Sequence, residues 1–100
     1  MKATVVQCPE NDVLRKINFL FRKKNYKLVD EKVDSAAGKF EYNVKQKSWF
    51  FSEGFTFRLN RVSDSNMRIE LSFNGGGNDL FNPIAQQKEL QMMESIYRMF

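Results

Sequence analysis

The stretch Met67-Arg68-Ile69-Glu70-Leu71-Ser72-Phe73 decides the fold, because large apolar side chains alternate with polar ones along it. This period of two is typical of a β-strand with one face in a core and the other in water. The same alternation runs through residues 39–45 and again through 49–59, where Gly54 predicts a bulge or bend. A further strand is expected to open at Tyr26, and turn-forming residues separate the strands at 34–38 and 63–66. The centre of the chain therefore predicts four consecutive antiparallel strands.

Helical patterns lie on both sides of these strands. Pro9 precedes a segment whose apolar residues recur with helical spacing as far as Lys24, and Asn82-Pro83 predicts the start of a last helix. A short β-favouring run at residues 2–7 comes before the first helix. The predicted order is β-α-β-β-β-β-α, an α+β fold in which both helices cover the packed face of one antiparallel sheet.

This element order resembles the TATA-binding-protein-like fold, which the kinase-associated C-terminal domain also uses, and resembles a shortened helix-grip domain less closely. The resemblance covers the whole chain as topology and is accompanied by no family motif. It implies a sheet whose outer face can bind DNA. In this chain the outward positions mix both signs of charge: Lys39, Glu41, Lys45, Arg58, Arg68 and Glu70. Phosphate binding favours positive charge without interspersed carboxylates, so nucleic acid is an unfavoured partner.

Composition sets the class of protein. The 100 residues, 42% of them apolar, suffice for one domain over 1–100 with a core that needs no cross-links. Cys8 is the one cysteine, which rules out an internal disulfide, and it is expected to be buried. No stretch is apolar and long enough for a signal peptide or a membrane span, so we expect a cytoplasmic protein.

The net charge is a mild +4, and histidine is absent. Histidine is the commonest general base and a leading metal ligand, so its absence argues against most hydrolase triads and zinc sites. Gly75-Gly76-Gly77 lacks the Lys-Ser/Thr ending of a phosphate loop and is expected to be a plain connector. We therefore expect no enzyme activity and no cofactor.

The first helix carries an unusual outer face. Opposite its apolar stripe, Phe19 is expected among four cations: Arg15, Lys16, Arg22 and Lys23. This pattern predicts a docking surface for a protein or an anionic surface, with Phe19 as the anchor and the cations as steering charges. A solvated helix face, with Phe19 against a loop or a second subunit, explains the same pattern.

An aromatic sheet face supports a second hypothesis. Trp49, Phe51, Phe55 and Phe57 share one parity and could hold a small apolar ligand between sheet and helices. Glu53 has the same parity and is expected to turn outward at the bulge. At least two methionines among Met92, Met93 and Met99 are expected in the core, although the last helix could instead complete a homodimer interface.

Overall fold

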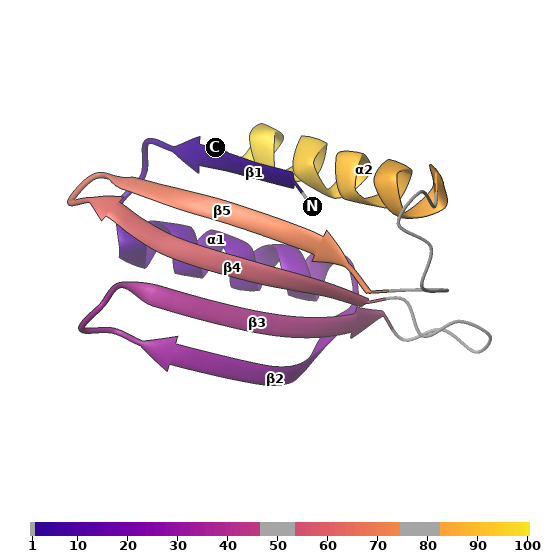
Figure 1. The fold of residues 1–100 in the computed structure, drawn as a ribbon, viewed down its shortest axis with the longest axis horizontal. Coiled ribbons are helices and arrows are strands. Elements are labelled where there is room, and N and C mark those ends of the chain that lie inside the picture. Colours follow the sequence, from indigo (N-terminus) through magenta and orange to yellow (C-terminus); the bar gives the residue numbers. More distant parts are fainter. Residues whose placement is uncertain (1, 47–53, 75–82) are drawn as a thin grey trace.

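The computed structural model describes residues 2–46, 54–74 and 83–100 (Figure 1). Its elements follow the predicted order: β1 (Lys2–Val6), α1 (Glu10–Lys23), β2 (Tyr26–Asp34), β3 (Lys39–Gln46), β4 (Gly54–Ser63), β5 (Asn66–Phe73) and α2 (Pro83–Met99). The α+β class and the β-α-β-β-β-β-α order are therefore confirmed. No helix among the described residues is long and apolar enough to cross a membrane.

The five strands form a single antiparallel sheet in the order β1-β5-β4-β3-β2. The strands β2 to β5 are neighbours along the chain and form a meander. The strand β1 joins at the far side, where Val6 lies opposite Met67 on β5. The two borders of the sheet are thus β1, which α2 packs beside, and β2, which lies farthest from α2 (Figure 1).

One buried cluster lies between the sheet and both helices. The alternating residues of β4 and β5 supply its centre, and Phe57, Ile69 and Leu71 have no exposed area. Phe21 from α1 meets the Phe57 ring edge-on, with 5.0 Å between ring centres. The helices add these buried side chains: Val13, Ile17, Leu20 and Phe21 from α1, and Met92, Met93 and Ile96 from α2. Both helices therefore cover the same face, and the expected core methionines are confirmed.

Gly54 begins the described part of β4 and pairs with Lys45 of β3. Among the described strand pairs, the register shifts at bulges between Leu28 and Asp30 and between Arg61 and Ser63, and the residues just before Gly54 lie outside the described part of the chain. A Cβ atom at Gly54 would lie only 2.7 Å from the carbonyl oxygen of Val44, so a close approach of β3 requires the glycine. Trp49, Phe51, Glu53 and the run 75–77 lie outside the described residues.

Candidate functional site

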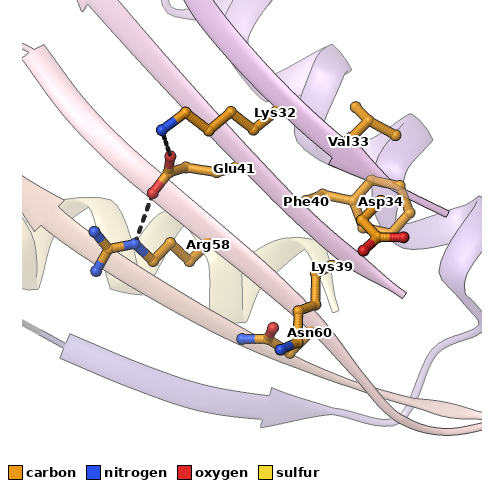
Figure 2. Close-up of a pocket in the computed structure, with 8 residues that line it drawn as sticks. All are labelled: Lys32, Val33, Asp34, Lys39, Phe40, Glu41, Arg58 and Asn60. Atoms are coloured by element: carbon orange, nitrogen blue, oxygen red, sulfur yellow. Dashed lines mark hydrogen bonds and ion pairs between the residues drawn. The ribbon is translucent and has the colours of Figure 1, made fainter. Parts of the chain in front are cut away.

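The outer face of the sheet carries a chain of ion pairs across four strands. Figure 2 shows Glu41 between Lys32 and Arg58, with Lys32 Nζ at 3.7 Å from one carboxylate oxygen and Arg58 Nε at 2.8 Å from the other. Arg58 Nη1 also lies 3.7 Å from Glu70, whose second oxygen is 3.0 Å from Arg68 Nη1. Register explains the alignment, because Lys32, Glu41, Arg58 and Glu70 are directly opposed on neighbouring strands.

These contacts shift the titration of the charged groups they join. The hydrogen bond from Arg58, with help from Lys32, lowers the pKa of Glu41 below its ordinary value of 4.5. The same hydrogen bond raises the pKa of Arg58. A hollow of about 320 Å³ opens on this face, lined by Lys32, Val33, Asp34, Lys39, Phe40, Glu41, Arg58 and Asn60. Because its cations stand next to carboxylates, the hollow presents little surplus charge to a polyanion.

A second hollow, here called the helix groove, lies between α1 and α2. It encloses about 470 Å³ and is lined by Phe19, Leu20, Lys23, Lys24, Ser95, Arg98 and Met99. Leu20 is buried at 3% exposure, whereas 58% of Phe19 is exposed. An aromatic ring therefore stands at the edge of a concave surface where it can contact a second molecule.

The charges of the helix groove are all of one sign. Lys23, Lys24 and Arg98 line it, and none of its seven lining residues is acidic. Within the described part of the chain, the side chains of these three cations form no ion pair and no hydrogen bond. Lys23 and Arg98 occupy the last turns of their helices, where the helix dipole favours cations. The dipole accounts for those two positions but not for an exposed phenylalanine beside them.

The structure separates the cations that the helical pattern grouped around Phe19. Lys23 lines the groove with it, and Arg22 is exposed but is not among the lining residues. Arg15 donates a hydrogen bond of 2.9 Å to Asp12 Oδ1, one turn earlier on the same helix, so its charge is paired there. The predicted set is therefore divided, and only Phe19 and Lys23 remain at the candidate site.

Lys16 points toward the end of α2, whereas the helical pattern of α1 alone predicts that it points into solvent. Its Nζ donates to the carbonyl oxygen of Met99 at 3.3 Å and lies 4.8 Å from the centre of the Phe100 ring. The last carbonyl oxygens of a helix receive no hydrogen bond from within the helix, so a lysine at that end can donate to one of them. Lys16 is thus half-buried and connects α1 to the end of α2 instead of joining a free cationic face.

Three groove residues were missed from sequence: Lys24, Ser95 and Arg98. Arg98 in the last turn of α2 and Lys24 just after α1 were visible as isolated cations. Their proximity depends on α2 crossing the sheet beside α1, and helical periodicity within either segment carries no such information.

The aromatic residues of the ligand-carrier hypothesis pack against one another where they are described. Phe55 contacts Tyr26, Phe57 and Phe73 with ring centres 5.8, 6.1 and 5.3 Å apart. A hollow of about 300 Å³ reaches Phe55, but most of its lining is polar: Lys24, Tyr26, Gln46, Lys88 and Gln91, with Met92. Phe57 is fully buried, and Trp49 and Phe51 lie outside the described residues.

The resemblance to TATA-binding-protein-like domains stays a prediction from element order. Comparison with known protein families, with characterised proteins and with solved structures finds no match to this chain.

Proposed function

We propose that this domain is a non-enzymatic interaction module whose helix groove binds an acidic segment of a partner protein. The observation that carries the proposal is the exposed Phe19 beside three cations, Lys23, Lys24 and Arg98, in a hollow without a carboxylate. Aromatic residues and arginine are enriched at binding hot spots, and surplus cations steer an acidic partner toward the site.

The shape of the site favours a peptide segment over a lipid surface. A hollow of about 470 Å³ accommodates one or two side chains. Membrane-surface helices instead present a projecting apolar face that enters the lipid headgroups. The matching ligand is an extended or helical stretch of aspartate and glutamate with one apolar side chain, which packs against Phe19 and Met99.

The test uses three labelled peptides and fluorescence anisotropy. The first peptide contains aspartates and glutamates with one central leucine, the second replaces its acids by asparagine and glutamine, and the third replaces the leucine by alanine. We expect the first peptide to bind, and we expect the affinity of each of the other two to be lower by at least about tenfold. Equal binding of the neutral twin would contradict the proposed role of charge.

Two variants assign the binding to the groove. Phe19→Ser removes the anchor, and the double variant Lys23→Gln with Arg98→Gln removes two cations. Both should weaken binding about tenfold and leave Tm nearly unchanged, because these side chains are exposed. Matched controls are Val62→Ser, an equally exposed apolar residue, and Lys39→Gln with Lys45→Gln on β3.

A double-mutant cycle makes the contact itself testable. If the leucine of the peptide packs on Phe19, then Phe19→Ser should cost little against the alanine peptide, although it costs much against the leucine peptide. Additive losses would mean that the leucine binds somewhere else and would remove Phe19 from the site.

A further inference from the structure

The strand β2 forms a long border of the sheet, and no other described strand pairs with its outer edge. It has nine residues, and every residue from Lys27 to Asp34 is exposed. In the described sheet it pairs with β3 alone, so the hydrogen-bonding groups along its other side have no strand partner. An uncovered strand of this kind is a ready template for pairing with another strand.

Apolar side chains on β2 add to this exposure. Leu28, Val29 and Val33 are 42%, 54% and 53% exposed. Leu28 and Val33 lie opposite Val44 and Phe40 of β3, which are buried, so both point to the helix side of the sheet. The border of the sheet therefore extends the apolar surface past the point where the helices bury it.

The outer face of β2 alternates in charge. Lys27, Asp30, Lys32 and Asp34 lie opposite Lys45, Asn43, Glu41 and Lys39, which places all four on the outer face. Read along the strand, the signs are plus, minus, plus, minus. When such a strand pairs antiparallel with a copy of itself, the order reverses and each sign meets its opposite.

The bulge between Leu28 and Asp30 is what makes this match geometrically consistent. Lys27 and Asp34 are separated by an odd number of positions, so in a regular strand they would lie on opposite faces. The additional residue, Val29, restores them to one face. Bulges and lysines usually hinder pairing at a sheet edge, but here both features fit a second copy.

We propose that β2 pairs antiparallel with β2 of a second copy of this chain, about a twofold axis at Glu31. In this register Lys27 meets the partner's Asp34, Asp30 meets the partner's Lys32, and Leu28 meets the partner's Val33. Each of these contacts occurs twice by symmetry, and the two sheets become one. The surface is separate from the helix groove, so this dimer and the peptide binding are independent.

The register contains one unfavourable contact, Glu31 against the partner's Glu31. Glu31 lies opposite Tyr42, and burial of that phenol raises its pKa, with a smaller contribution from the charge of Glu31. Like charges facing each other across strands destabilise a pairing. Glu31→Gln should therefore strengthen the dimer several-fold, whereas the same change at an unrelated carboxylate, Glu94→Gln, should not.

The decisive experiment is a charge exchange followed by sedimentation velocity, over concentrations that reach the sub-millimolar range. The unaltered chain should show a concentration-dependent monomer–dimer equilibrium. Asp30→Lys places a lysine against the partner's Lys32, and Lys32→Glu places a glutamate against the partner's Asp30. The dimer affinity of each variant alone should fall by at least about tenfold, and an equimolar mixture of the two variants should restore the dimer.

The outcomes are distinct. Lys45→Glu on β3 carries the same charge change as Lys32→Glu and should leave dimerisation intact, and thermal unfolding confirms that each variant is folded. A monomer at all concentrations would overturn the proposal. Two variants that dimerise normally would also overturn it, because another surface must then be used. Weakened variants whose mixture fails to recover would contradict the register about Glu31.

Discussion

The outer face of the sheet and the helix groove both carry several cations and both contain a hollow of a few hundred cubic ångströms. They differ in how the charge is matched. On the sheet, strand register sets cations directly opposite carboxylates, as with Glu41 between Lys32 and Arg58. In the groove, Lys23 ends α1, Lys24 follows it and Arg98 belongs to α2, and no acidic side chain lines the hollow that they share.

This difference shows that the number of cations on a surface is a poor guide to what it binds. A cation next to a carboxylate contributes a little to stability, and part of its charge is compensated before a ligand arrives. A cation without such a neighbour attracts an incoming anion with its full charge. The groove cations lie beside Phe19, an exposed ring that adds apolar contact.

The largest effect is expected when a carboxylate is placed beside the groove cations, so that they are paired as the cations on the sheet are. Ser95→Glu places a carboxylate among the three cations, where it can pair with Arg98 one turn later on α2. We expect the acidic leucine peptide to bind about tenfold more weakly, and the free energy of unfolding to change by less than about 0.5 kcal/mol, because the pair with Arg98 and the unfavourable helix dipole oppose each other. Ser95→Gln is the control of matched size, measured by the same anisotropy and thermal-unfolding assays. Unchanged peptide affinity in Ser95→Glu would show that the groove cations do not contact the peptide.

A smaller effect is expected when the pairing on the sheet is removed. Glu41→Gln leaves Lys32 without its carboxylate and leaves Arg58 with only the longer contact to Glu70. Tm should fall by a few degrees, measured by circular dichroism. Glu94→Gln on exposed helix surface should leave Tm the same. Equal Tm changes in the two variants would mean that the ladder of charges on the sheet contributes nothing to the fold.

The smallest expected effect is a pH dependence that separates the two surfaces. The pKa of Glu41 is lowered in the folded protein, chiefly by the hydrogen bond from Arg58. Its contribution to stability is therefore fully present above its ordinary value of 4.5 and is lost as the pH falls through the lower folded value. The Tm difference between the unaltered chain and Glu41→Gln should shrink between about pH 6 and about pH 3. A difference that stays constant over this range would show that the glutamate acts through packing and not through charge.

Sequence periodicity predicted the elements well and the site incompletely. Alternation in β3 to β5 and the helical spacing of Val13, Ile17 and Leu20 depend on local geometry, so they gave the fold class, the element order and the core face. Gly54 was predicted within a longer strand because the alternation of Trp49 and Phe51 continues across it, and those two residues lie outside the described part of the chain. The close approach to Val44 that requires a glycine there is a contact between strands, which one segment does not reveal.

The site depends on contacts between helices that lie far apart in the sequence. A projection of α1 alone places Lys16 on the outside, but the end of α2 comes close enough for the lysine to bond the Met99 carbonyl. The same crossing brings Arg98 to Lys23 and Lys24. Of the basic surface predicted around Phe19, the structure places Phe19 and Lys23 in the groove lining, and the other groove cations come together only through the packing of the two helices.

The place of β1 in the sheet has a consequence for how the chain folds as it is synthesised. β1 pairs with β5 and, among the described strands, with no other (Figure 1). Strands β2 to β4 follow one another and can associate early, whereas the first strand waits for the emergence of residue 73 before its partner is complete. Until then the ribosome-bound chain exposes Val6, which the folded domain buries, and the free edge of β4. Slow translation through β5 would prolong the stage at which this protein is most prone to aggregate.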